Sequence, residues 1–240
     1  MPSDTDVLRI SDLKAVTIME SRTTIERGTT GLRTWLASFT LARYLLSNPN
    51  LVNQRRVLEL GSGTGFLGSV VASLQLNSPH ALSDDTRIWM TDVDENVLTR
   101  CRDNFQLPCN ASAKHQNTAF RKLDWSHSLN TATCASLQGT LRNEIRADVI
   151  LGADLVFDPS LIPALVGTLR LGLHNADVFA LISLTVRQEA TVTAFLDAAS
   201  SALNVVEVET SCDQGADLFT SATGGTDVNL AVRIFRIMSK

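Results

Sequence analysis

A cluster of glycines between two apolar segments constrains this chain more than any other feature. Residues 55–68 read RRVLELGSGTGFLG, in which Gly61, Gly63 and Gly65 stand at alternate positions. Residues without a Cβ let the backbone turn sharply and let a ligand lie against it. Apolar residues precede the glycines as a short run and follow them at helical spacing. The pattern predicts a buried strand, a tight turn and an amphipathic helix whose amino terminus offers free N–H groups.

Two classes of cofactor use a turn of this kind. Dinucleotides bind G-x-G-x-x-G, which residues 63–68 fit. Enzymes that use S-adenosylmethionine (SAM) carry E-L-G-x-G-x-G, which residues 59–65 match at every fixed position. Glu59 would repel a pyrophosphate and would suit the ammonium group of SAM. The loop therefore favours SAM, with a dinucleotide site and a glycine turn that binds nothing as the alternatives.

The composition indicates one ordinary globular domain. The chain has 240 residues, of which 44% are hydrophobic and 19% charged, values typical of a single α/β domain. The net charge of −4 argues against direct binding of nucleic acid. No apolar run reaches the roughly 18 residues of a membrane span, and the first residues are acidic and lack the apolar core of a signal peptide. Four scattered cysteines without a C-x-x-C pair fit a reduced, cytoplasmic protein.

Acidic residues follow the second and third predicted strands. Residues 87–91 form the second strand, and Asp92 at its end can accept hydrogen bonds from a ribose diol. Asp94 is the alternative, although it can instead cap the helix predicted over residues 95–105. Asp124 and Trp125 follow a weak third strand, where the carboxylate can bind an adenine amine and the indole can contact the ring. Simple packing under a loop would also explain Trp125.

The fourth predicted strand, residues 147–152, leads to a second acid and an aromatic residue. Ligands of open α/β sheets bind outside the carboxyl ends of the strands, where Asp154 is expected to face the glycine loop. Asp154 and Phe157 could hold an ammonium group together, by charge and by the face of the ring. A purely structural role is the alternative for each. Asp158 and Pro159 predict the start of the next helix.

The remaining segments complete the fold prediction. A β-hairpin is expected within residues 13–26, and residues 1–30 are expected to form an N-terminal extension to a domain over residues 31–240. A helix is predicted over residues 32–46, with Trp35 in its first turn. Strands over residues 178–185, 205–209 and 228–237 follow, the last two without a helix between them. We therefore expect an α/β fold with a Rossmann-like seven-strand sheet, mostly parallel with an antiparallel C-terminal strand.

Five strings carry a resemblance to a known family. The strings are GTTGLRTW at residues 28–35, VLELGSG at 57–63, LDW at 123–125, ADLVF at 153–157 and TVR at 185–187. Together they resemble the seven-strand SAM-dependent protein-lysine methyltransferases. The glycine loop is common to SAM enzymes of this fold, whereas the first and last strings are similar to the branch that methylates translation elongation factor 2.

The resemblance implies a set of site residues and a partner. Residues implied to line the SAM site are Trp35, Gly61, Ser62, Gly63, Asp92, Trp125 and Ala153, to which the residue-based reasoning adds Glu59 and Asp124. Asp154 and Phe157 match the acid-x-x-aromatic motif and are predicted to be catalytic, although the family usually has Tyr at the second position.

The resemblance further implies elongation factor 2 as the methyl acceptor, and we expect a cytoplasmic monomer without a metal. The family also tends to have a longer N-terminal region. Another methyl acceptor, such as a different protein or a small molecule, and a non-catalytic SAM-binding scaffold are the alternative functions.

Overall fold

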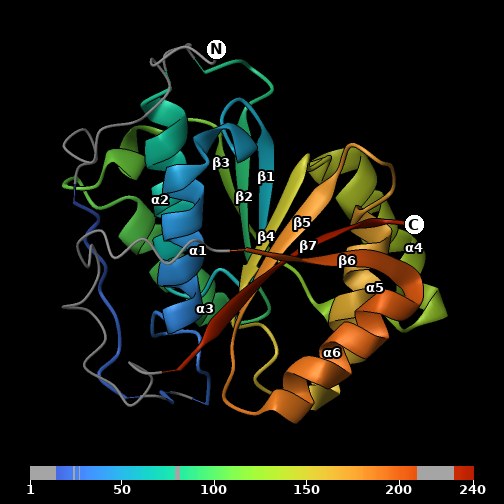
Figure 1. The fold of residues 1–240 in the computed structure, drawn as a ribbon. Coiled ribbons are helices and arrows are strands. Elements are labelled where there is room, and N and C mark those ends of the chain that lie inside the picture. The colour runs from blue at the N-terminus through green and yellow to red at the C-terminus, as the bar shows by residue number, and fades with distance from the viewer. Residues whose placement is uncertain (1–14, 24, 27, 79–81, 210–229) are drawn as a thin grey trace.

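A seven-stranded sheet lies between two layers of helices (Figure 1). The computed structural model describes residues 15–23, 25, 26, 28–78, 82–209 and 230–240. The strands are β1 (Arg56–Leu60), β2 (Arg87–Asp92), β3 (Thr118–Lys122), β4 (Val149–Ala153), β5 (Phe179–Thr185), β6 (Leu203–Val208) and β7 (Val232–Ser239). The α-helices are α1 (Leu36–Ser47), α2 (Phe66–Leu76), α3 (Glu95–Phe105), α4 (Thr131–Gly139), α5 (Ile162–Gly172) and α6 (Glu189–Ala202).

The strand order is β3-β2-β1-β4-β5-β7-β6. Strands β1 to β5 pair in parallel, whereas β7 is antiparallel to both β5 and β6. This arrangement confirms the predicted mostly parallel sheet and its antiparallel C-terminal strand. The direction of winding reverses between β1 and β4, and a ligand crevice in such a sheet forms outside this switch point.

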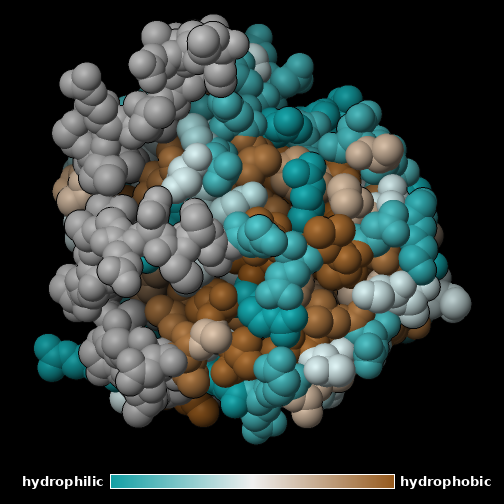
Figure 2. Space-filling model, in the orientation of Figure 1, coloured by the Kyte–Doolittle hydropathy of each residue, from teal (hydrophilic) through white to brown (hydrophobic). Residues whose placement is uncertain are grey.

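Each face of the sheet has its own apolar core. Leu58 and Leu60 of β1 pack on the side of α4, α5 and α6, whereas Val57 packs on the side of α1, α2 and α3. Figure 1 shows these two groups of helices on opposite sides of the strands. In the same view, apolar side chains gather over the middle of the visible face, with hydrophilic side chains around them (Figure 2). The sheet is therefore held from both sides, which fixes the ends of its strands.

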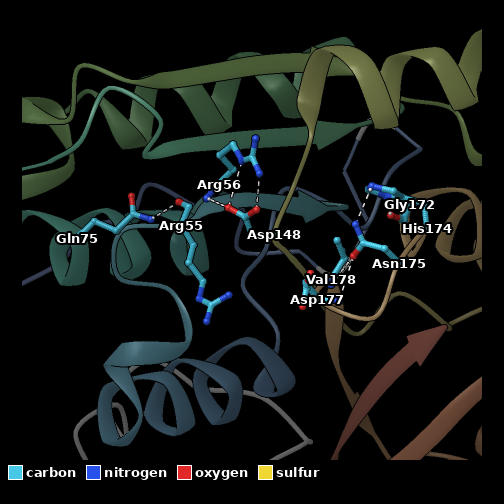
Figure 3. Close-up of polar contacts among 9 residues, drawn as sticks. All are labelled: Arg55, Arg56, Gln75, Asp148, Gly172, His174, Asn175, Asp177 and Val178. Carbon is cyan, nitrogen blue, oxygen red and sulfur yellow. Dashed lines mark hydrogen bonds and ion pairs between the residues drawn. The ribbon is translucent and has the colours of Figure 1, made fainter.

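Polar contacts fix the amino ends of the central strands (Figure 3). Asp148, just before β4, accepts hydrogen bonds from the backbone N–H of Arg56 at 2.8 Å and from its Nε at 3.1 Å. The backbone carbonyl of Arg55 accepts from the Gln75 side chain at 3.0 Å. Asn175 accepts from the N–H groups of residues 177 and 178 in the turn before β5. These contacts set the register of the strands whose opposite ends carry the site.

The predicted N-terminal hairpin is not confirmed over the residues that the structure describes. Among the described residues of this segment, 15–23 form no strand, and an isolated bridge joins Glu26 to Thr29. The side chain of Asn110 bonds to both backbone groups of Thr17, and Asn104 does the same for Met19. These asparagine amides take the place of a partner strand. Residues 1–14 of the predicted N-terminal extension, Cys212, and the first two residues of the last predicted strand lie outside the described residues.

Helix boundaries otherwise follow the predictions closely. Asp94 caps α3 by accepting from the N–H groups of residues 96 and 97, and Asp158 caps the 3₁₀ turn Pro159–Leu161 that leads into α5. The exception is α1, which begins at Leu36 instead of residue 32. Thr34 bonds to the Glu20 carboxylate through its N–H and to Thr64 through its hydroxyl, so tertiary contacts keep the preceding turn out of the helix.

Candidate functional site

A cavity of about 860 Å³ opens at the carboxyl ends of β1 to β5. Segments that follow these five strands line it, together with the turn before α1. Ten of the eleven predicted site residues are in the lining: Trp35, Gly61, Ser62, Gly63, Asp92, Asp124, Trp125, Ala153, Asp154 and Phe157. The volume falls within the range of about 300–1,000 Å³ of small-molecule sites. Residues separated by more than 100 positions in the sequence thus share one concave surface.

The glycine loop forms one wall of the cavity. Gly61, Gly63 and Gly65 have φ angles of 58°, 54° and 84°, in the region that residues with a Cβ rarely adopt. A Cβ at Gly61 would come within 2.7 Å of the Leu155 side chain, and a Cβ at Gly63 within 3.2 Å of the Gly31 carbonyl oxygen. Helix α2 begins immediately after the loop. The loop therefore presents bare backbone and a helix amino terminus to the cavity.

Asp92 lies beside this loop at the end of β2. Its carboxylate accepts hydrogen bonds from Gly63 N at 3.3 Å and from Asp94 N at 3.1 Å, and burial raises its pKa. Asp94, the alternative acid, is not in the cavity lining because its side chain caps α3. Of the two acids, Asp92 is the one placed to meet a ligand.

Asp124 and Trp125 border the same part of the cavity. The ring of Trp125 lies 3.6 Å from the position that a Cβ on Gly61 would occupy, so the indole sits next to the loop. Asp124 caps the short 3₁₀ helix Trp125–Ser128 and accepts from Ser126 N at 2.9 Å. This hydrogen bonding at Ser126 lowers the pKa of Asp124. The carboxylate is thus ionised and fixed at the edge of the cavity.

Glu59 does not line the cavity, unlike the other predicted site residues. Its side chain is buried beneath the loop, where a Cβ on Gly68 would lie 2.9 Å from Oε2. Oε2 has no hydrogen-bond partner among the described residues, and burial raises the pKa of Glu59 to about 8. The alternation of β1 explains the placement, because Leu58 and Leu60 point to one face and Glu59 to the other. The structure therefore gives no support to the predicted direct contact with an ammonium group.

Asp154 is held tightly at the end of β4. Its φ of 54° is in the left-handed region, which Asp tolerates better than most residues. Its carboxylate accepts from Thr185 N at 2.8 Å, from Thr185 Oγ1 at 2.8 Å and from Arg187 Nη2 at 3.3 Å. Only 5% of its side chain is exposed. Roles for Thr185 and Arg187 were missed from the sequence, although the TVR string was itself a signal.

Phe157 and Trp35 lie at other parts of the cavity surface. Phe157 follows Asp154 by three residues and is 61% exposed, so its ring is open to an incoming molecule. Trp35 precedes α1 and donates from its ring nitrogen to the Thr30 carbonyl at 3.2 Å. The guanidinium carbons of Arg33 and Arg187 lie 5.7 Å and 5.1 Å from the centre of the Trp35 ring. Arg187 thus joins this wall of the cavity to the Asp154 side.

A family profile described as "Lysine methyltransferase" matches residues 12–202. The chain belongs to the lysine methyltransferase family. Within this family it is 37% identical over 156 residues to the protein-lysine N-methyltransferase EFM3 of Chaetomium thermophilum, covering 65% of this chain and 42% of that one. It is 33% identical over 158 residues to human protein-lysine N-methyltransferase EEF2KMT, covering 65% and 44%. The chain thus matches less than half the length of these two curated relatives.

The fold of this lysine methyltransferase family member is also found among solved structures. An O-methyltransferase from Bacillus cereus, in complex with SAH, superposes with a TM-score of 0.51 over 83% of this chain and 81% of that one, at 14% identity. At this identity the likeness concerns the fold. Within the described part of the chain, no helix has both the length and the apolar character that crossing a bilayer requires.

Proposed function

We propose that this lysine methyltransferase family member is a SAM-dependent protein-lysine N-methyltransferase that acts on translation elongation factor 2. The observation that carries the proposal is the cavity, in which the glycine loop and Asp154 lie on walls formed by adjacent strands, β1 and β4. Similarity to the two protein-lysine N-methyltransferases supports a protein lysine as the acceptor, and the resemblance of residues 28–35 and 185–187 supports elongation factor 2. We also expect a cytoplasmic monomer that does not bind nucleic acid directly and needs no metal.

The residues of the first wall fit SAM. Asp92 would accept hydrogen bonds from the ribose diol, and Asp124 and Trp125 would bind the adenine. Gly61, Ser62 and Gly63 would contact the cofactor through a backbone that a Cβ would obstruct. Trp35 and Ala153 would complete the site from the turn before α1 and the end of β4. When bound, SAM supplies an activated methyl group that a neutral amine can accept.

The second wall would receive the lysine. A carboxylate has about four acceptor positions, and three donors already bond to Asp154. The remaining position on Oδ1 can accept from an amine N–H and so aim its nitrogen. Phe157 can offer its exposed ring face to the same group. Because a free lysine has a pKa of about 10.4, the site must receive an amine that has lost its proton to water.

Calorimetry tests the cofactor assignment. The purified protein should bind SAM and S-adenosylhomocysteine and should not bind NAD, because the Asp92 carboxylate lies beside the loop where a pyrophosphate would lie. Binding of NAD without a response to SAM would refute the assignment.

Labelling tests the acceptor. The protein is incubated with tritiated SAM and an extract from cells that lack it, and the labelled band is identified by mass spectrometry. Label on a lysine of elongation factor 2 is the expected result. Label on a different protein or on a small molecule would keep the SAM chemistry and reject the acceptor.

A further inference from the structure

We propose, on the basis of the function proposed above, that Arg187 is a positioning residue that neutralises Asp154 and so lets the substrate amine enter the site uncharged. Arg187 follows the end of β5 and belongs to the TVR string of residues 185–187. Its guanidinium forms an ion pair with the carboxylate of Asp154, which lines the cavity three residues before Phe157. This role in the reaction is separate from the binding of SAM.

The guanidinium of Arg187 contacts two walls of the cavity. Nη2 lies 3.3 Å from Oδ2 of Asp154, and the guanidinium carbon lies 5.1 Å from the centre of the Trp35 ring. The Arg187 side chain is 34% exposed, whereas that of Asp154 is 5% exposed. The positive charge is therefore the more accessible member of the pair, and it stands beside any amine that bonds to Asp154.

Hydrogen bonds from Thr185 make Asp154 a fixed partner for this charge. Its N–H and hydroxyl each donate to a different oxygen of the carboxylate at 2.8 Å. The left-handed backbone at Asp154 and a bond from its N–H to the Ser183 carbonyl at 2.9 Å hold the main chain as well. Asp154 cannot turn away from Arg187 without losing these contacts. The pair therefore acts as one unit of no net charge.

Neutrality matters because the reacting lysine must be uncharged. A carboxylate alone would stabilise the ammonium form and raise the pKa of the lysine, whereas an adjacent guanidinium opposes that shift. As the ammonium approaches the site, it gives one proton to solvent water, and the electron pair of the broken N–H bond becomes the lone pair of the neutral amine. Among the described residues, the other charged ones that line the cavity are Arg33, Asp92 and Asp124. Asp92 accepts a hydrogen bond from Gly63 of the glycine loop, Asp124 caps the short helix that begins at Trp125, and Arg33 contacts the Trp35 ring.

The test compares the pH dependence of methyl transfer in four proteins: wild type, R187Q, R187K and the double variant D154N/R187Q. Single-turnover transfer to purified elongation factor 2 gives the midpoint of the acidic limb for each. R187Q should raise the midpoint by about one pH unit. At pH values below the midpoint, methyl transfer should then be about tenfold slower than in wild type. R187K keeps the charge and should stay near the wild-type midpoint. The double variant should return toward it, because both charges are gone.

Two further measurements separate this role from others. Calorimetry with S-adenosylhomocysteine should give the same affinity for wild type and R187Q within a few fold. In the presence of S-adenosylhomocysteine, an NMR titration with n-butylammonium chloride at pH 7 should show at least about threefold tighter binding to R187Q, because an uncompensated carboxylate attracts the cation.

Each measurement can also overturn the proposal. An unchanged midpoint in R187Q, or an equal shift in R187K, would show that the charge of Arg187 has no such role. Loss of S-adenosylhomocysteine binding in R187Q would make Arg187 a cofactor residue, and equal binding of n-butylammonium would contradict the neutralised pair. A wild-type protein that transfers no methyl group to elongation factor 2 refutes the proposed acceptor, and the n-butylammonium titration still decides the inference.

Discussion

Replacing Glu59 by glutamine should stabilise the folded protein relative to wild type, and this stabilisation should be larger at pH 8 than at pH 5. Glu59 is buried beneath the glycine loop, and one of its oxygens has no hydrogen-bond partner among the described residues. Burial raises its pKa from the usual 4.5 to about 8. The folded protein therefore holds a proton on Glu59 at neutral pH, whereas the unfolded chain does not. Glutamine keeps the size of the side chain and removes the titration.

The sign and size follow from linkage. Because the folded pKa is the higher one, the contribution of Glu59 to stability is fully present below pH 4.5 and is lost as the pH rises through about 8. Each unit of difference corresponds to about 1.4 kcal/mol, so wild type should lose roughly 3 kcal/mol relative to E59Q between pH 5 and pH 8. For a chain of this length, this is a difference in Tm of roughly 6–12 °C.

The assay is thermal unfolding of wild type and E59Q at pH 5 and pH 8, without ligand. Subtracting the Tm of wild type from the Tm of E59Q at each pH removes the effect of the other titrating groups, which both proteins share. The Tm of E59Q should exceed that of wild type by a margin that widens with pH. An equal difference in Tm at pH 5 and pH 8 would mean that Glu59 is ionised in the folded protein. Its description as a neutral buried acid would then be wrong.

Three other substitutions probe the cavity itself. Asp92→Ala should weaken SAM binding by about 1.5–3 kcal/mol through the loss of hydrogen bonds to a charged group, whereas Asp94→Ala should only remove a helix cap worth about 1 kcal/mol; calorimetry showing the reverse order would identify Asp94 as the ligand. Gly63→Arg should abolish SAM binding with an unchanged far-UV circular dichroism spectrum, because the residue has a φ of 54° and its Cβ would lie near the Gly31 carbonyl oxygen. Retained binding would contradict the role of the glycine loop in holding the cofactor. Phe157→Ala should lower kcat/KM for the acceptor by the equivalent of about 0.5–2 kcal/mol, with SAM affinity unchanged; weaker SAM binding would place its ring in the cofactor site.

Much of the fold could be predicted because local patterns and long-range packing agree. The apolar stretch of β5 is buried along its whole length, as its composition predicted. No helix was predicted between the two closing strands, and these strands form the expected antiparallel pair. Position at the ends of strands was equally informative, because Asp92, Asp124 and Asp154 all reach the same cavity.

The sequence predictions that the structure did not confirm depend on contacts between residues far apart in the sequence. The expected hairpin is absent from the described residues because the side chains of Asn104 and Asn110, about 90 positions away, satisfy the backbone groups that a partner strand would have used. Glu59 points to the face of β1 opposite Leu58 and Leu60, beneath the loop instead of into the cavity at the end of the strand, and the motif does not encode that direction. Arg187 meets Asp154 across 33 positions, so a pairwise contact of this kind was visible only once the strand order was known.

The most direct test of the account measures methyl transfer to purified elongation factor 2 by wild type and Asp154→Asn, with SAM affinity measured beside it. Asparagine keeps the shape of the side chain and removes its charge. Wild type should methylate a lysine, and the variant should bind SAM within a few fold of wild type. The variant should transfer the methyl group at least about 10²-fold more slowly, as expected for a positioned polar group. Loss of SAM binding in step with activity would make Asp154 a cofactor residue and contradict the account.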